Sequence, residues 1–351
     1  MKYARGYGKK GSVLISTLWI TAILALLAMG IGFRVSLEVR LSKYHMDKLE
    51  ARYLAKAGIA KAQEFLLKGT NESDSLYACG ISPEAGGTPE SIFGAEYNKL
   101  GNGAFSVHYT LKKEDEEGGT GDIHYGMADE ERKINLNMDK LARGNKAEFK
   151  RILKGLSPDM TEEIVNAVID WQDTDTSASF PGGAEDFDYE AEFGYGCKDE
   201  ELESVQELLL VKGMTAGLYG EIKDYVTVYG NGKININTVS REALRAIIDD
   251  GTGTYAELVN DILAFRNGDD EIGGTADDRI FASTDELKLI VREDDIHGKT
   301  RIDMLLPYFT VKSENFRIIS HGEAGKIRRT ITWVGRKGAG GELEILYYHE
   351  K

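Results

Sequence analysis

The chain has 351 residues, and its 43 Lys plus Arg against 58 Asp plus Glu give a formal net charge of −15. This acidity argues against a general nucleic-acid-binding protein, because phosphate backbones need a basic face. The cysteine count excludes a disulfide-dense scaffold and a CxxC zinc cluster, and the scattered histidines form no HExxH motif. Hydrophobic residues make up 42% of the chain, which is enough for a folded core.

The N-terminus combines a basic segment, residues 1–11, with an uncharged apolar run over residues 12–33 that Arg34 closes. As a helix this run would span roughly 33 Å, which matches the hydrocarbon core of a bilayer. The basic flank predicts a cytoplasmic N-terminus and an exported remainder. The alternatives are a plain anchor or a cleaved secretory signal, but the run is longer than a classical signal core of about 7–15 residues.

The helical pattern continues beyond the apolar run. Apolar residues recur from Val35 to Leu66 with charged residues between them, and the first proline is Pro83. This amphipathic periodicity predicts one helix over residues 12–68, on the order of 85 Å long. A helix half in lipid and half packed on a globular domain is the shape of a type IV pilin-like subunit.

Three short motifs carry a family resemblance. Gly11 followed by residues 12–15, Ser-Val-Leu-Ile, resembles a prepilin peptidase site; Leu18-Trp19 follows, and residues 50–58 read Glu-Ala-Arg-Tyr-Leu-Ala-Lys-Ala-Gly. Most pilins and pseudopilins have Glu at the fifth mature position, where this chain has Ser16. The pattern resembles the type II secretion protein K minor pseudopilins (general secretion pathway protein K). The resemblance implies cleavage between Gly11 and Ser12 and methylation of Ser12.

Ser16 bears on where such a subunit would lie. In pilin-like fibres, the carboxylate at this position is held to pair with the amine of a neighbouring subunit, and an unpaired carboxylate in hydrocarbon is costly. Ser16 needs no such partner, which suits a subunit at the tip of the fibre; the alternative is that it is a tolerated small residue.

The resemblance also implies partners and a location. The partners are two other minor pseudopilins, of the I and J types, the major pseudopilin, the prepilin peptidase and the inner-membrane secretion platform. The chain would cross the inner membrane once, with a periplasmic globular part, and would initiate the pseudopilus and limit its growth during protein export across the outer membrane. We expect no catalytic or cofactor-binding residues, because the sequence assembles no nucleophile, base and oxyanion donor.

The middle of the chain contains a repeat. Lys-Ile-Asn-Leu-Asn at residues 133–137 recurs as Lys-Ile-Asn-Ile-Asn at 233–237, and each copy precedes helical segments and an acidic, Gly-rich loop. This predicts a duplicated helical unit. Residues 154–156 and 212–214 resemble helix-hairpin-helix turns, whose backbone N–H groups can hold phosphate. We interpret them as packing devices because acids outnumber bases around them; the alternative function is a membrane-anchored DNA-uptake receptor or a type IV pilus minor pilin.

The acidic loops are candidate metal sites. Ca²⁺ takes six to eight oxygen ligands, which clustered carboxylates on flexible Gly turns can supply. The first loop also resembles the calcium-binding region of the family, although neither loop is an EF-hand. We predict a structural Ca²⁺ ion in a first site formed by Asp173, Asp175, Glu185, Asp186 and Asp188. A second, weaker site would be formed by Asp269, Asp270, Asp277 and Asp278. The alternative for both is a solvated acidic loop.

The predicted fold class is α+β, with the long helix packed on a small antiparallel sheet and a large all-α domain inserted within that sheet. Alternation of apolar residues predicts the strands, with an acidic turn at 114–121: residues 104–112, 131–136, 316–320, 327–334 and 343–348. We expect a leader at residues 1–11 and a helix at 12–68, whose membrane half is 12–33. A pilin-like β domain would consist of two pieces, 69–137 and 308–351, with the helical insertion at 138–307 between them. Cys79 and Cys197 would both lie outside the membrane, where a disulfide between them is one option.

Overall fold

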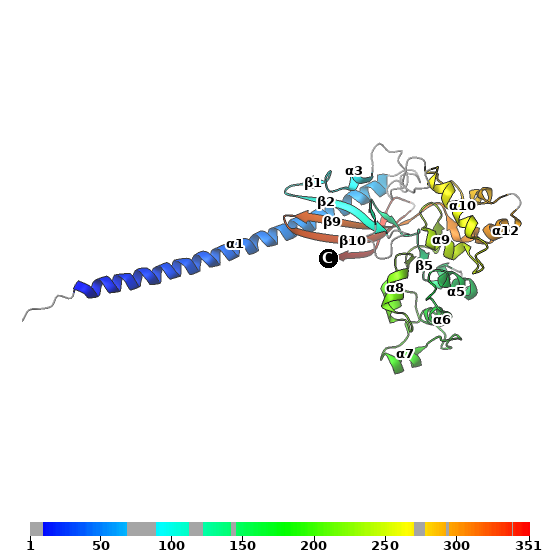
Figure 1. Ribbon diagram of the computed structural model, residues 1–351, viewed down its shortest axis with the longest axis horizontal. Coiled ribbons are helices and arrows are strands. Elements are labelled where there is room, and N and C mark those ends of the chain that lie inside the picture. Colours follow the sequence, from blue (N-terminus) through cyan, green and yellow to red (C-terminus); the bar gives the residue numbers. More distant parts are fainter. Residues whose placement is uncertain are drawn as a thin grey trace, which may run out of the picture.

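The computed structural model describes residues 10–68, 89–111, 122–141, 145–269, 278–292, 295–338 and 340–351. It consists of a long N-terminal helix, an antiparallel sheet and a group of short helices at the end of the molecule opposite the N-terminus (Figure 1). The predicted α+β class is therefore confirmed. Most of the leader, Cys79, the turn at 114–121, Asp270 and Asp277 lie outside the described residues.

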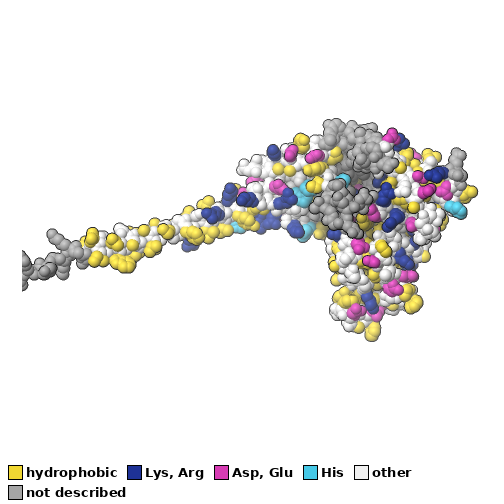
Figure 2. Space-filling model, in the orientation of Figure 1, with side chains coloured by type: hydrophobic (Ala, Val, Ile, Leu, Met, Phe, Trp, Pro, Cys, Tyr) yellow, Lys and Arg dark blue, Asp and Glu magenta, His cyan; other side chains and the backbone are white. Residues whose placement is uncertain are grey.

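Helix α1 runs without interruption from Lys10 to Lys68. Its first half is exposed and includes an 18-residue stretch with a mean hydropathy of 2.3, so by length and composition it can cross a membrane. Its second half packs on the sheet through small and apolar residues, among them Ala55, Ile59 and Leu66. Figure 2 shows this change of character as apolar side chains along the free part of the helix, with basic ones where it approaches the globular part.

The main sheet has the strand order β1-β2-β9-β10-β11, with β3 paired to β2 and β4 paired to β9, all antiparallel. One face packs against α1 through Phe316, Ile318 and Trp333. The strand bounds are β1 Lys99–Leu100, β2 Gly103–Leu111, β3 Asp122–Tyr125, β4 Ala128–Asp129, β9 Asn315–Ala324, β10 Ile327–Lys337 and β11 Leu343–Glu350; the short helix α3, Pro89–Phe93, precedes them.

The strand predicted at 131–136 differs from the structure. Only Ile134–Asn135, β5, is extended, and it pairs in parallel with β6, Val226–Thr227, rather than with the main sheet. The second copy of the repeat behaves alike, because β7, Ile234–Asn235, pairs in parallel with β8, Phe309–Thr310. Each copy of the repeated motif therefore forms a short parallel strand pair at the start of its helical unit and does not extend the main sheet.

The helices form a separate core between β5 and β8, which includes Phe149, Val165, Leu244 and Ile262. Amphipathic spacing and polar N-caps such as Thr161 define their starts. The elements are α4 Met138–Leu141, α5 Lys146–Lys154, α6 Glu162–Asp170, α7 Asp186–Glu192, η1 Val205–Leu210, α8 Ala216–Ile222, α9 Arg241–Ile248, α10 Ala256–Asn267, η2 Thr284–Glu286, α11 Leu287–Ile290, α12 Ile296–Leu305 and η3 Leu306–Tyr308.

A buried ion pair joins the helical part to the sheet. Glu130 follows β4 and is fully buried, and its carboxylate accepts hydrogen bonds from Arg317 of β9 and, at 2.6 Å, from the hydroxyl of Thr227 in β6. Although burial alone would raise the pKa of Glu130, the charges of Arg317 and Lys133 lower it to about 2. Glu130 is therefore charged at neutral pH and connects the sheet, through Arg317, to the helical part, through Thr227.

Two further carboxyl groups strengthen this junction. The Asp129 carboxylate accepts from the hydroxyls of Thr238 and Ser313, each at 2.6 Å. Glu131 accepts from the side chain of Asn315 at 2.6 Å and from its backbone N–H at 3.0 Å. Burial raises the pKa of both carboxyl groups, and for Glu131 the nearby Asp129 raises it further. The sheet and the second helical unit thus share one polar network, which we call the acidic junction (Asp129, Glu130 and Glu131).

Gly58 marks the closest approach of α1 to the sheet. A Cβ at this position would collide with the hydroxyl of Ser320 and lie 3.0 Å from the ring of Phe105. Gly32 offers a contrast in the same helix, because a Cβ there meets nothing within 4 Å. Gly58 is therefore a packing requirement, whereas Gly32 is not.

We expect Gly58→Leu to destabilise the globular part by about 1–3 kcal/mol, because an overpacked contact forces the helix away from the sheet. Thermal melting of the full chain in detergent, followed by circular dichroism, measures the effect, with Gly32→Leu as the matched control. Equal melting temperatures for the two variants would contradict this account of the contact.

Candidate metal centre

The first acidic loop begins at the end of α6, where Asp170 is fully buried. The backbone N–H of Ser179 donates to Asp170 Oδ2 at 2.9 Å, which folds the loop back over the helix end. Gly183 lies so close that a Cβ would collide with the same carboxylate, and Gly182 has a φ of 72°. These glycines let the chain turn tightly and return to Glu185, directly before α7.

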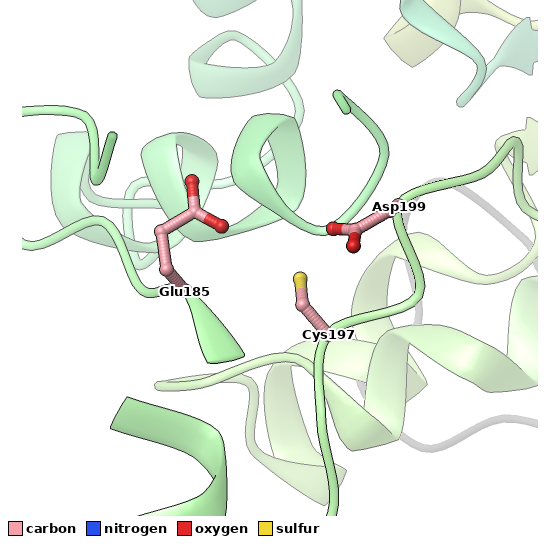
Figure 3. Close-up of side chains that lie close together, drawn as sticks. All are labelled: Glu185, Cys197 and Asp199. Atoms are coloured by element: carbon pink, nitrogen blue, oxygen red, sulfur yellow. The ribbon is translucent and has the colours of Figure 1, made fainter. Parts of the chain in front are cut away.

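Four carboxylates converge beneath this loop, and we call them the acidic cluster: Asp170, Asp173, Glu185 and Asp199. The ligand atoms of Asp170, Asp173 and Glu185 lie within 4.8 Å of one another, and Glu185 forms a second such group with Asp199 and Cys197. In Figure 3 the side chains of this second group point into a common space. The chain brings them together from α6, the acidic loop and the segment that follows α7.

Each member of the acidic cluster has one buried oxygen without a hydrogen-bond donor in the described part of the chain. These atoms are Asp170 Oδ1, Asp173 Oδ1, Glu185 Oε1 and Asp199 Oδ1. A buried carboxylate oxygen without a donor is costly, and such an atom requires an explanation in a native protein. A bound cation would supply the missing interaction for all four.

The electrostatics of the acidic cluster agree with this interpretation. Burial and then the charges of Asp170, Asp173 and Asp199 raise the pKa of Glu185 to about 7. Burial is also the main cause of the raised pKa values of Asp170 and Asp199. Lys146 reaches only the outer oxygen of Asp173, Oδ2, at 2.8 Å. The cluster therefore carries more negative charge than this lysine balances.

The donor set favours a hard cation. Carboxylate oxygens suit Ca²⁺ and Mg²⁺, whereas zinc sites of this size use thiolates or imidazoles. Burial raises the pKa of the Cys197 thiol to about 12, and its sulfur donates to the carbonyl of Asp170 at 3.3 Å. Cys197 is thus a protonated hydrogen-bond donor at the edge of the acidic cluster.

The structure brings together only some of the predicted ligands. Asp173 and Glu185 belong to the acidic cluster, but Asp175 is exposed on the loop. Asp186 accepts from the backbone N–H of Cys197 at 2.7 Å, and Asp188 accepts from that of Glu185 at 3.2 Å, so both serve to fix the local fold.

Sequence reasoning did not propose Asp170 or Asp199 as ligands. Asp170 belongs to helix α6, and Asp199 lies beyond α7, after the last predicted ligand of the first site, Asp188. The nearest sequence signal is the Gly182-Gly183 pair, which indicates that the chain doubles back toward α6.

The second predicted site is described only in part. Asp269 is exposed and lies 3.4 Å from Arg279, and Asp278 is half-buried. Asp270 and Asp277 lie outside the described residues, so the ligand set of this site stays a prediction.

The two repeat motifs fix the ends of both acidic loops in the same way. Asn137 accepts from the backbone N–H of Leu202 at 2.8 Å and donates to its carbonyl at 3.2 Å. Asn237 makes the same pair of bonds to Phe281, at 2.8 Å and 3.1 Å. Each asparagine thus clamps the segment that follows its own loop, which gives the sequence repeat a physical role.

The backbone of the two hairpin-like turns, at residues 154–156 and 212–214, contacts other parts of the protein. A Cβ on Gly155 would lie 2.9 Å from the Cα of Ala246, and its backbone N–H donates to Arg151 and Ile152. In the second turn, the N–H of Lys212 donates to the hydroxyl of Tyr189 at 3.1 Å. These groups are engaged within the protein, which supports packing rather than phosphate binding.

A long, half-apolar N-terminal helix packed on a small antiparallel sheet, with an inserted helical domain, defines a pilin-like subunit. Residues 132–231 match the family model described as type II secretion system (T2SS), protein K. The chain is 25% identical over 268 residues to type II secretion system protein K of Pseudomonas aeruginosa, covering 72% of each chain. It is 32% identical over 105 residues to protein K of Aeromonas hydrophila, covering 28% of this chain and 32% of that one.

A solved structure shows the same fold. The chain superimposes with a TM-score of 0.60 and 17% identity on a chain of the crystal structure of the GspK-GspI-GspJ complex from the enterotoxigenic Escherichia coli type 2 secretion system. The match covers 88% of this chain and 99% of the other. The sequence matches and the shared fold together make this chain similar to the protein K minor pseudopilins of type II secretion systems.

The raised pKa of Glu185 predicts how stability depends on pH without bound metal. Its ordinary value of 4.5 is raised to about 7, so between these values the folded chain binds a proton that the unfolded chain does not. In chelator, stability should therefore fall as the pH rises through this window. Melting temperatures between pH 4 and pH 8 measure the effect, and Glu185→Gln should flatten it. An unchanged slope in this variant, or a loss of slope in Glu190→Gln on exposed α7, would contradict the assignment.

Proposed function

We propose that this chain is a minor pseudopilin of a type II secretion system and that it lies at the tip of the pseudopilus with two other minor pseudopilins, of the I and J types. There it initiates assembly and limits growth for protein export across the outer membrane. The observation that carries the proposal is the place of the inserted helices, α4 to α12, at the end of the sheet away from the N-terminus of α1 (Figure 1). A further subunit added on that side would have to occupy the volume that these helices fill.

The solved relative supports the choice of partners, because that structure contains GspK together with GspI and GspJ. Ser16 is also consistent with the tip, since it replaces a carboxylate that would need a neighbour. We assign the chain a structural role in assembly rather than catalysis.

We also propose that the chain is stored in the inner membrane through α1 before assembly. The N-terminus would be cytoplasmic and the globular part periplasmic, as the basic flank and apolar half of the helix favour. The prepilin peptidase would cleave between Gly11 and Ser12, and Ser12 would be methylated. The secretion platform would then deliver the subunit to a fibre of the major pseudopilin.

The tip position predicts a labelling pattern on isolated fibres. Gold-labelled antibodies against the helical domain should mark a single end of each pseudopilus in electron micrographs, whereas antibodies against the major pseudopilin should mark its whole length. Labelling by the first antibody along the fibre would contradict the proposal, and so would fibres of normal number and length in cells that lack this chain.

We further propose that the acidic cluster holds a structural Ca²⁺ ion. Asp170, Asp173, Glu185 and Asp199 would be its ligands, and the four buried oxygens without donors carry this assignment. The ion would supply charge compensation and fix the loop between α6 and α7 to the segment after α7. A second, weaker ion would use Asp269, Asp270, Asp277 and Asp278.

The ligand set can be tested by comparing two matched substitutions. Ca²⁺ at about a hundred times its dissociation constant should stabilise the full chain in detergent by about 2.7 kcal/mol over chelator, seen as a rise in melting temperature. Asp199→Asn should abolish this rise, whereas Asp175→Asn, on the exposed part of the loop, should keep it. No rise in the unsubstituted chain would reject the ion, and a rise lost only in Asp175→Asn would reject the ligand set. Mg²⁺ in place of Ca²⁺ tests the choice of metal.

A further inference from the structure

A cleft of about 410 Å³ lies between the sheet and the helical domain, on the opposite face of the sheet from α1. One wall comes from β9, β10 and β11, through residues that include Ile319, Thr332 and Tyr347. The other wall comes from η1 and α8 with the segment that follows it, including Val205, Tyr219 and Tyr229. The acidic cluster does not contribute to this cleft, so the two features are independent.

The cleft is basic although the protein is strongly acidic. Four cations line it, Arg132, Lys133, Lys223 and Arg317, against one lining carboxylate, Asp224. Lys133 and Arg317 both contact Glu130, which lies buried beneath the cleft wall. One buried carboxylate thus serves two cations.

Arg132 and Lys223 differ from these two cations. In the described part of the chain neither forms an ion pair with a carboxylate, and Lys223 is exposed at the rim on the helical side. Because the lining contains only one acid, the cleft keeps a positive field that a bound anion would neutralise.

The acidic junction makes this site rigid. Arg317 donates to Glu130, and its guanidinium lies 5.9 Å from the centre of the Tyr229 ring. Glu130 also accepts from Thr227, so the same group that positions Arg317 holds the wall containing Tyr229. A site whose charged group is already fixed loses little conformational entropy on binding.

The lining also has features that suit a polypeptide. Tyrosines offer flat apolar area together with a hydroxyl, as in many protein-binding surfaces. Tyr347 belongs to β11, which pairs with β10 alone among the described strands, so within the described part of the chain its outer edge has no strand partner. Such an edge binds extended segments through backbone hydrogen bonds, while nearby pockets select the side chains.

We propose that this cleft binds an extended, acidic peptide segment of a partner protein, with Arg132 and Lys223 receiving its carboxylates. Arg317 and Lys133 provide the positive floor, and Tyr347 packs against the peptide at the open edge. The site depends neither on the ion at the acidic cluster nor on the position of the subunit in the fibre.

The experiment uses the full chain in detergent and a fluorescein-labelled hexaglutamate peptide with a blocked C-terminus. Fluorescence anisotropy should report saturable binding that weakens with added NaCl, as expected for charge pairing at a surface. Hexaglutamine with the same label should bind at least tenfold more weakly. Lack of hexaglutamate binding, or equal binding of the two peptides, overturns the proposal.

Two double variants separate the cleft from the net charge. Arg132→Glu with Lys223→Glu should weaken hexaglutamate binding at least tenfold. Lys99→Glu with Lys326→Glu makes the same change in charge at exposed positions on β1 and on the turn between β9 and β10, and should alter binding less than threefold. Equal loss in both overturns the proposal.

A third variant separates a peptide from a small anion. Tyr347→Ser, at a side chain that is 41% exposed, should weaken hexaglutamate binding severalfold without changing the melting temperature. Inorganic phosphate should compete only at millimolar concentrations. Unchanged peptide affinity in Tyr347→Ser, or displacement by micromolar phosphate, would mean that the cleft is a simple anion site and would overturn the proposal.

Discussion

The ion pair between Glu130 and Arg317 connects the two halves of this molecule, and much of the remaining architecture depends on it. Glu130 lies where the chain leaves the sheet, Arg317 lies on β9, and Thr227 reaches the same carboxylate from β6. Removing one partner of such a buried pair costs about 3–5 kcal/mol, because the other charge is left without compensation. The pair, together with Thr227, therefore fixes the position of the helices relative to the sheet.

This restriction explains how one chain can place a large helical domain within a pilin-like sheet. The acidic junction connects Asp129 to Thr238 in the second unit, while the first unit is held through Thr227. Each unit then fixes its own acidic loop by an asparagine clamp, Asn137 in the first and Asn237 in the second. These contacts connect the acidic junction to the repeat motifs, and the repeat motifs to the acidic loops. The acidic cluster therefore lies in a fixed position relative to the sheet.

The sequence predicted the features that depend on local periodicity. The helix of α1, the strands β2, β9, β10 and β11 and the repeat at 133–137 and 233–237 all follow from patterns within a few residues. The prediction of a strand of the main sheet over 131–136 was wrong in extent and in sheet, because only Ile134–Asn135 is extended and it pairs with β6. Glu131 is instead a buried acceptor for Asn315, a contact 184 positions away along the chain. Asp199 was missed for a related reason: its place in the acidic cluster arises only when the segment after α7 returns to α6. Long-range returns of this kind leave little trace in local composition.

The acids of this protein differ in how their oxygens are satisfied, and that difference separates structural groups from candidate ligands. Asp129 receives hydroxyl donors from Thr238 and Ser313 and a backbone N–H from Glu131, so its buried oxygens have hydrogen-bond partners within the protein itself. The four oxygens of the acidic cluster, buried to a similar degree, have no such donors in the described chain. Burial, acidity and proximity are common to both places, and only the supply of donors differs. A bound cation would therefore supply a missing partner at the cluster but not at the junction, a distinction that net charge and the spacing of acids along the sequence cannot provide.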